Sequence, residues 1–164
     1  MRIISGKYGG RTFQPPAKMP YTRPTTDLAK GGLFNVIENN LDIESLKTLD
    51  LFGGTGSISY ELASRGATDQ TIVEKDSNMA AFIQQTGEKL GVKLKIVKMD
   101  VFKYIENCNE KFDFIFAKQL LNDGGWFVLE HTPRNSYTNF PFYRAERNYG
   151  TTIFSIFVNK PKEE

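Results

Sequence analysis

Two carboxylates frame a glycine-rich turn in the first half of the chain. Asp50 stands just before the segment Phe52-Gly53-Gly54-Thr55-Gly56, and Glu74 follows about twenty residues after the turn. Glycines let a backbone approach a ligand closely, and a carboxylate at the later position can bond the two hydroxyls of a ribose. These residue types at this spacing predict a site for a cofactor of the nucleotide type.

Asp50 decides which cofactor of that type fits. A carboxylate at the mouth of the turn would repel a pyrophosphate seated on the N-terminus of the following helix. S-adenosylmethionine has no phosphate, and it carries an ammonium group, a sulfonium and a ribose diol. We therefore expect Asp50 near the ammonium, directly or through water, and Glu74 on the ribose. An NAD site and an ordinary glycine-rich turn with surface acids are the alternatives.

A third acid follows the next expected strand, residues 94–99. In a parallel sheet Asp100 reaches the same edge as the other two acids, and ligands of such sheets bind at that edge. Asp100 can accept a hydrogen bond from an adenine amino group, beside an apolar wall from Val101; capping the short helix 101–107 is the alternative role. The predicted cofactor-binding residues are Asp50, Phe52, Gly53, Gly54, Thr55, Gly56, Glu74, Asp100 and Val101.

Alternating strands and helices must position these residues. Helices are expected from Ser57 to Gly66 and from Ser77 to Gly91, each with its serine as N-cap and its glycine at the end. A hairpin around residues 148–150 leads into a long last strand, 151–158. The pattern is that of a Rossmann-like, doubly wound α/β sheet, mostly parallel with an antiparallel C-terminal hairpin strand. Its other strands are predicted before Asp50 and at 70–74, 94–99, 112–117 and 126–130.

The composition fits one enzyme domain. Of the 164 residues, 40% are hydrophobic and 13% aromatic, which is enough for a packed core. No run resembles a signal peptide or a membrane span, and the single cysteine, Cys108, excludes an internal disulfide and a cysteine-based zinc site. We therefore expect a cytoplasmic monomer without a metal.

The N-terminal residues are basic. Residues 1–32 hold six basic side chains against one acid, although the net charge of the whole chain is only +2. The pattern around residues 6–10 predicts a β-hairpin extension with Lys7, Tyr8 and Arg11 at or near its tip. Such an extension favours a polyanion, and an aromatic at its tip favours RNA; a solvated tail is the alternative. The predicted RNA contacts are Arg2, Lys7, Tyr8, Arg11 and Arg23.

A proline-rich linker completes this extension at residue 22, and residues 23–164 form the expected catalytic domain. Thr25 or Thr26 is expected to cap a helix that runs through Glu38. Gly31-Gly32 lies inside this helix at a cost of about 1 kcal/mol for each glycine relative to alanine, and the sequence offers no reason for it.

The connection after the expected strand 112–117 is short. A parallel crossover needs roughly a dozen residues and usually a helix, but only residues 118–125 precede the next strand. Those residues resemble the last turn of a helix and its glycine cap, without a beginning. Either the two strands are antiparallel neighbours, or a segment belongs here that the sequence lacks; we favour the missing segment.

Six motifs together give the chain a family resemblance. In chain order they read MRIISGKYGGRTF, RPTTDLAKGGLFN, LDLFGGTGSISYELASRGA, TIVEKD, FDFIFA and YGTTIFSIF. The chain resembles the bacterial 16S ribosomal RNA guanine-N2 methyltransferases over nearly its whole length. The resemblance implies methyl transfer from S-adenosylmethionine to a guanine amine, in 16S ribosomal RNA or in the assembling small ribosomal subunit.

Two departures from that family matter. Gly31-Gly32 stands where the family usually has an acid followed by a small residue, so a ligand role of that acid does not carry over. After the strand 112–117 the family has an Asn- or Asp-Pro-Pro-Tyr/Phe motif and a helix, whereas Lys118 follows here directly. In the family that motif accepts the two hydrogens of the guanine amine and stacks on the base. No catalytic residue is therefore assigned.

Two other functions stay open. DNA adenine-N6 methylation shares the cofactor and the amine chemistry, although the chain shows no separate target-recognition domain. An inactive module that binds S-adenosylmethionine and RNA is the better interpretation if the chain truly runs from Ala117 into Lys118. His131 follows a strand end near the expected site, and its ordinary interpretation is a loop histidine with satisfied hydrogen bonds.

Overall fold

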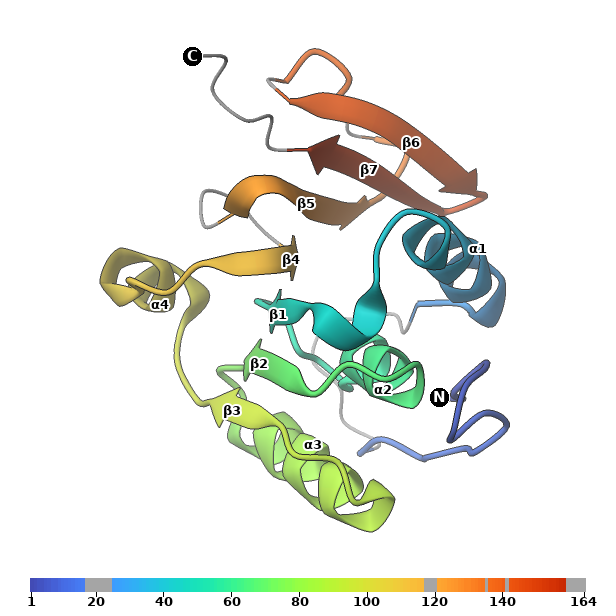
Figure 1. Cartoon of the computed structure of the whole chain (residues 1–164). Helices are drawn as coiled ribbons and strands as arrows, with labels where there is room; N and C mark the ends of the chain where they lie inside the picture. The colour runs from blue at the N-terminus through green and yellow to red at the C-terminus, as the bar shows by residue number, and fades with distance from the viewer. Residues whose placement is uncertain (17–24, 117–120, 135, 141, 159–164) are drawn as a thin grey trace.

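The computed structural model describes residues 1–16, 25–116, 121–134, 136–140 and 142–158, and within them it forms one seven-stranded sheet (Figure 1). The strand order is β3-β2-β1-β4-β5-β7-β6. The first five strands in this order are parallel, and β7 runs antiparallel to both β5 and β6. The predicted fold class is confirmed. The strands are β1 Lys47–Asp50, β2 Asp69–Val73, β3 Lys95–Val97, β4 Phe112–Phe116, β5 Leu121–His131, β6 Tyr143–Tyr149 and β7 Thr152–Val158.

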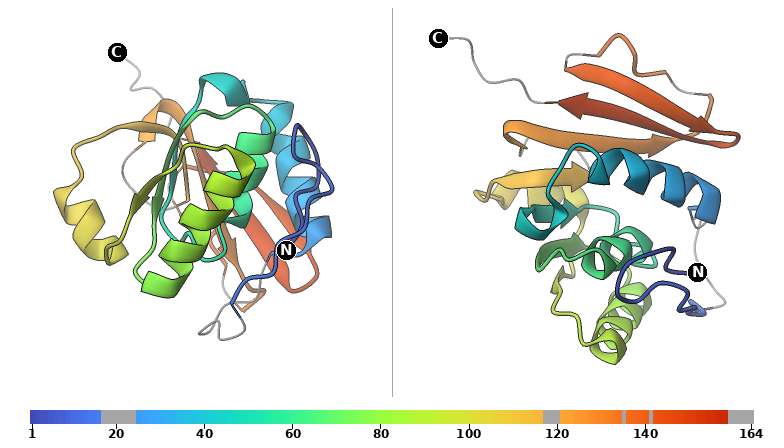
Figure 2. Two further views of the ribbon diagram at one scale, coloured as in Figure 1. Left: turned by 90° about the horizontal axis from the view of Figure 1, so that it is seen from below. Right: turned by 45° about the vertical axis from the view of Figure 1, so that its right-hand side comes forward.

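In the described part of the chain, four α-helices cover the two faces of this sheet unequally. Figure 2 shows α1, α2 and α3 on one face and α4 on the other. Right-handed crossovers explain the arrangement, because the path from β3 to β4 runs across the sheet in the opposite direction to that from β1 to β2. None of these helices is long and apolar enough to cross a bilayer. They are α1 Asp27–Glu38, α2 Ser57–Ser64, α3 Ser77–Leu90 and α4 Val101–Asn107, with a short 3₁₀ helix at Ile43–Ser45.

The helix caps partly differ from the sequence prediction. Thr26 caps α1 as expected, accepting a hydrogen bond from the backbone N–H of Ala29 at 3.2 Å. Serine does not cap α2 or α3. Gly56, with φ of 75°, precedes α2, and Asp76 caps α3 by accepting from the N–H groups of Asn78 and Met79. Aspartate competes well for this position because its charge also favours the positive end of the helix.

Gly32 in α1 has a packing reason that the sequence does not show. A Cβ built there would lie 1.8 Å from the hydroxyl oxygen of Tyr149 in β6, whereas one at Gly31 would meet nothing within 4 Å. The Tyr149 ring also packs edge-on against Phe154 of β7. The absence of a side chain at Gly32 therefore lets α1 approach the antiparallel end of the sheet.

The connection from β4 to β5 is the irregular part of the sheet. The strands pair in parallel, which contradicts the antiparallel alternative, and their register shifts between Phe112 and Phe114. Residues 121–125 belong to β5, so their interpretation as a helix end is wrong. Between the two strands the sequence has only residues 117–120, which lie outside the described part.

Candidate cofactor and nucleic-acid sites

The three acids predicted from the sequence lie at the carboxyl edge of the parallel strands. Asp50 is the last residue of β1, Glu74 directly follows β2, and Asp100 follows β3 and precedes α4. Backbone hydrogen bonds continue the sheet beyond its strands here: the N–H of Gly53 donates to the carbonyl of Val73 at 3.1 Å, and the N–H of Glu74 donates to that of Val97 at 3.1 Å. The edge is therefore built from contiguous, hydrogen-bonded backbone.

Asp50 is held in one orientation beneath the glycine turn. Its side chain is buried, and its two oxygens accept hydrogen bonds from the N–H of Phe52 and from the hydroxyl of Ser59, each at 3.2 Å. Ser59 was not among the predicted site residues. Its position on the first turn of α2, nine residues after Asp50, is the signal that could have identified it. The arrangement fixes a negative charge near the start of α2.

Glu74 is tied to the same turn. Its carboxylate accepts from the N–H of Gly54 at 2.8 Å and from the N–H of Asp76 at 2.8 Å, one on each oxygen. A carboxylate oxygen has a second lone pair, so each can still accept another hydrogen bond. A vicinal diol supplies two donors at a matching spacing, and the half-buried Glu74 is oriented for such a ligand before it arrives.

Most backbone N–H groups of the glycine turn donate hydrogen bonds to acceptors within the protein. The N–H groups of Phe52, Gly53, Gly54 and Gly56 donate respectively to Asp50, Val73, Glu74 and the carbonyl of Gly53. Gly54 and Gly56 have positive φ values, 50° and 75°, and a Cβ at Gly53 would lie 2.4 Å from the side chain of Ile72. Three glycines are thus required here, and the turn differs from one whose N–H groups face a phosphate.

Asp100, the third acid, caps α4. Asp100 accepts from the N–H of Phe102 at 3.0 Å, which confirms the capping alternative for this residue, and lies 3.8 Å from the ammonium of Lys75. Val101 is half-buried beside it. Phe52 and Phe102, both beside this edge, are 66% and 73% exposed. Two exposed aromatic rings beside these acids offer flat apolar surface to a ligand.

The N-terminal residues form the predicted hairpin in reduced form, and they dock on α2. Arg2 and Thr12 make one antiparallel bridge, and the N–H groups of Ile3 and Gly10 donate hydrogen bonds to the carbonyls of Arg11 and Ile3, respectively. The turn of the hairpin contacts the last residue of α2: the N–H of Lys7 donates to the Ser64 carbonyl at 2.7 Å. Figure 2 shows this segment lying along α2, so the alternative of a solvated tail is wrong for residues 1–13.

The residues predicted to contact RNA differ in their exposure to solvent. Tyr8 is only 8% exposed and belongs to an apolar cluster with Tyr60 and Leu90, so the prediction that it is presented at the hairpin tip is wrong. Lys7 and Arg11 are exposed and lie over its ring, with their charges 5.3 and 5.4 Å from the ring centroid. Arg2 is half-exposed and pairs with Asp27 at 2.9 Å. Arg23 lies outside the described residues.

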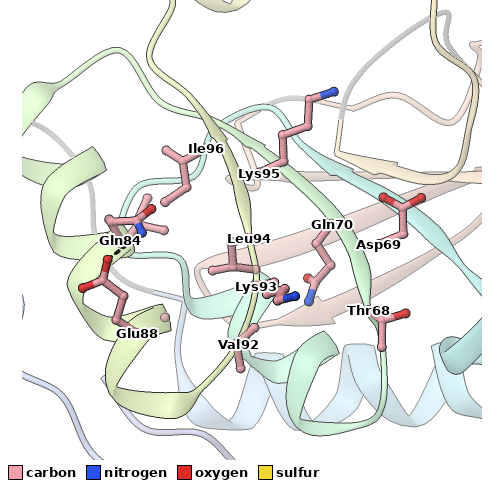
Figure 3. A pocket seen from close by; sticks show the side chains of 12 residues that line it. Thr68, Asp69, Gln70, Gln84, Glu88, Val92, Lys93, Leu94, Lys95 and Ile96 are labelled. Carbon is pink, nitrogen blue, oxygen red and sulfur yellow. Dashed lines mark hydrogen bonds between the residues drawn. The ribbon is translucent and has the colours of Figure 1, made fainter.

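His131 ends β5 at the carboxyl edge of the sheet, whereas a surface cavity lies at the amino edge. The two ring nitrogens of His131 lie 2.8 Å from the Ser155 hydroxyl and 3.0 Å from the Thr132 carbonyl, so it is a satisfied histidine. A cavity of about 470 Å³ lies between α3 and the amino ends of β2 and β3, lined among others by Asp69, Gln84 and Lys95 (Figure 3). It opens at the opposite edge of the strands from Asp50.

Comparison with known proteins assigns the chain to a family. The family model described as conserved hypothetical protein 95 matches residues 1–118. The chain belongs to this family. Ribosomal RNA small subunit methyltransferase D of Buchnera aphidicola is 30% identical over 117 residues, 71% of this chain, and the match spans 59% of that relative's own length. The resemblance deduced from the six motifs is confirmed.

A second relative is longer than this chain over the aligned region. An uncharacterized methylase of Rickettsia prowazekii is 36% identical over 176 residues, covering 98% of this chain and 72% of the relative. Since 98% of 164 residues is about 161, about 15 aligned positions of that family member have no counterpart in this chain. The family match itself ends at residue 118, just after β4.

Solved structures share the fold. A hypothetical protein of Thermus thermophilus superposes with a TM-score of 0.80 at 22% identity, covering 96% of this chain and 98% of that one. The 16S rRNA N2 G1207 methyltransferase of the same species, solved with AdoMet and guanosine, gives a TM-score of 0.68 at 19% identity, covering 85% of this chain and 45% of that one. The Rossmann-like methyltransferase fold is thereby established for this family member.

Proposed function

We propose that this protein binds S-adenosylmethionine at the carboxyl edge of β1, β2 and β3 and serves the methylation of a guanine N2 amine in 16S ribosomal RNA. Asp50 would receive the ammonium of the cofactor, Glu74 its two ribose hydroxyls and Asp100 its adenine amino group. Val101 and Phe52 would supply apolar contact. Each of these roles matches the hydrogen-bonding capacity of the side chain to a group that the cofactor carries.

One observation carries the choice of cofactor. Four N–H groups of the glycine turn already have acceptors within the protein, and the Asp50 carboxylate lies under the turn. A pyrophosphate placed there would find few donors and an opposing charge. A ligand with an ammonium and a diol would find two carboxylates. This argues against NAD and for S-adenosylmethionine, which the relatives' description as methyltransferases also supports.

The transfer itself is a direct displacement. The lone pair of the guanine N2 nitrogen attacks the sulfonium methyl, the carbon–sulfur bond breaks, and its electron pair leaves the sulfur neutral in S-adenosylhomocysteine. The amine then loses a proton. Because the lone pair is delocalised into the base, acceptors for the two amine hydrogens must turn it toward the methyl group.

Those acceptors would come from a segment between β4 and β5 that these 164 residues do not contain. Three observations support this: the four-residue connection, the shift in strand register, and the family match that ends at residue 118. On the second face of the sheet α4 is the only helix in the described part of the chain, and a right-handed crossover after β4 would add another there.

The remaining functions are separated by one transfer assay. The natural protein is incubated with tritiated S-adenosylmethionine and, separately, with 16S ribosomal RNA, assembling small subunits or DNA. Label in RNA or the particles supports the proposal, and label in DNA alone favours adenine-N6 methylation. The intact mass of the natural protein decides the third function: a mass of 18.6 kDa makes this chain a binding module for S-adenosylmethionine and RNA.

A further inference from the structure

Lys30 of α1 is a buried cation that contacts both the hairpin and the first residue of α2. Its side chain is 1% exposed, and its ammonium donates to the backbone carbonyl of Arg2 and, at 3.2 Å, to the hydroxyl of Ser57. It also lies 3.3 Å from a carboxylate oxygen of Glu61. An ammonium has three donors, and these partners account for all of them.

The three partners belong to two parts of the molecule, the hairpin and α2. Arg2 is in the hairpin, Ser57 is the first residue of α2 directly after Gly56 of the glycine turn, and Glu61 lies one turn further along α2. Breaking any one contact would leave one N–H donor of the buried ammonium without a partner. The positions of the hairpin and of the turn are therefore linked through one side chain.

Glu61 of α2 also binds the hairpin directly. It is fully buried, and its two oxygens accept from the N–H groups of Ile4 and Ser5 at 2.9 and 3.0 Å, while Arg65 pairs with it at 2.9 Å. Burial lowers the pKa of Lys30, and the ion pair with Glu61 opposes that shift. The hairpin is thus held by buried charges on α1 and α2, in addition to its apolar contacts.

We infer that Lys30 is a positioning residue that couples binding of the methyl donor to binding of RNA; this inference rests on the proposed function. A cofactor that contacts the glycine turn also favours the position of Ser57 in which Lys30 holds the backbone of Arg2. The hairpin then loses less conformational entropy when Lys7 and Arg11 contact phosphates. Coupling of this kind is reciprocal, so each ligand tightens binding of the other.

The test removes one contact and leaves the ion pair intact. Filter binding measures the affinity of the full chain for a 16S ribosomal RNA transcript, without and with saturating S-adenosylhomocysteine. For the wild type we expect binding about fivefold tighter or more with S-adenosylhomocysteine, the lower end of typical coupling. Ser57→Ala should bind both ligands separately but lose this difference. Ser77→Ala, at the equivalent first position of α3, should keep it and serves as the matched control.

The outcomes separate the coupling from the function on which it rests. Failure of the wild type to bind S-adenosylhomocysteine or the transcript overturns the proposed function. Binding of both ligands with no mutual effect overturns the coupling alone. The same holds if Ser57→Ala retains the full wild-type difference, because Lys30 then contributes packing only. A melting temperature of Ser57→Ala close to that of the wild type excludes unfolding as the cause of a lost difference.

Discussion

The two sides of the central sheet differ in how they are built. On the side of β1, β2 and β3, each parallel strand is followed by a helix that returns the chain, and an acid stands where each strand ends. Between β4 and β5 the sequence has only four residues, which lie outside the described part, and the register of the two strands shifts. In the proposed function, the methyl donor contacts only the first side, whereas the methyl acceptor needs both. The contrast indicates that binding and catalysis can be tested separately in this protein.

The largest expected effect concerns the β4–β5 connection. We expect the natural protein to be heavier than 18.6 kDa by the mass of an inserted segment. Inserting the corresponding segment of the Rickettsia relative after Ala117 should raise methyl transfer to 16S ribosomal RNA by about 10²–10⁴-fold, the usual contribution of groups that orient and deprotonate a nucleophile. Tritium transfer measures this. Equal turnover with and without the segment would place the acceptor groups elsewhere.

The next effect concerns the proposed cofactor site at the carboxyl edge of β1, β2 and β3. Asp50→Ala should weaken binding of S-adenosylhomocysteine about 10- to 100-fold, because it removes a hydrogen bond between charged groups worth about 1.5–3 kcal/mol. Calorimetry measures the affinity. Asp69→Ala, which changes an exposed acid at the opposite end of the neighbouring strand β2, is the matched control and should leave it unchanged. Comparable losses in the two variants would remove Asp50 from the site.

A smaller effect tests how α1 reaches across to the antiparallel strands. Gly32→Ala should lower the free energy of unfolding by about 1–3 kcal/mol, because its new methyl overlaps the ring of Tyr149. Gly31→Ala places a methyl in open space and should raise it by about 0.5–1 kcal/mol. Thermal or urea unfolding of the two variants measures whether each free energy of unfolding rises or falls. If both variants are stabilised, Tyr149 moves aside freely and α1 does not depend on that contact.

The smallest effect lies at the amino edge, where no ligand is expected. Glu110 lies 2.8 Å from Lys47 and 2.6 Å from Lys95, and hydrogen bonds from these two lysines lower its pKa to about 2. A lowered carboxyl pKa adds stability above its unfolded value of 4.5, which is lost as the pH falls toward 2. Since all three side chains are a third or more exposed, Glu110→Gln should cost less than about 1 kcal/mol at neutral pH, and less in high salt. A salt-independent loss would contradict this account.

Local patterns in the sequence predict most of the carboxyl edge of β1, β2 and β3. The glycines, the strand endings and the acids lie within short stretches, so spacing alone brings Asp50 and Glu74 to the same turn. Caps were less predictable, since Asp76 and Ser77 both suit the start of α3 and only the folded backbone selects between them. The sequence offers no reason for Gly32, because Tyr149 lies more than a hundred residues away.

Local sequence patterns also do not predict the contacts of the hairpin. A basic, glycine-containing segment suggests exposed side chains, yet Tyr8 is buried and Lys30, counted with the basic residues of this region, is paired inside the protein. Their partners, Tyr60 and Glu61, come from α2. Burial of this kind depends on tertiary packing, which neither charge counts nor turn patterns describe.

The most direct test of the central claim is a calorimetric titration of the purified chain with S-adenosylhomocysteine and, separately, with NAD. The account predicts saturable binding of S-adenosylhomocysteine that is weakened by Asp50→Ala, and no binding of NAD, because the N–H groups of the glycine turn are already engaged and Asp50 opposes a pyrophosphate. Binding of NAD, or of neither ligand, would contradict it.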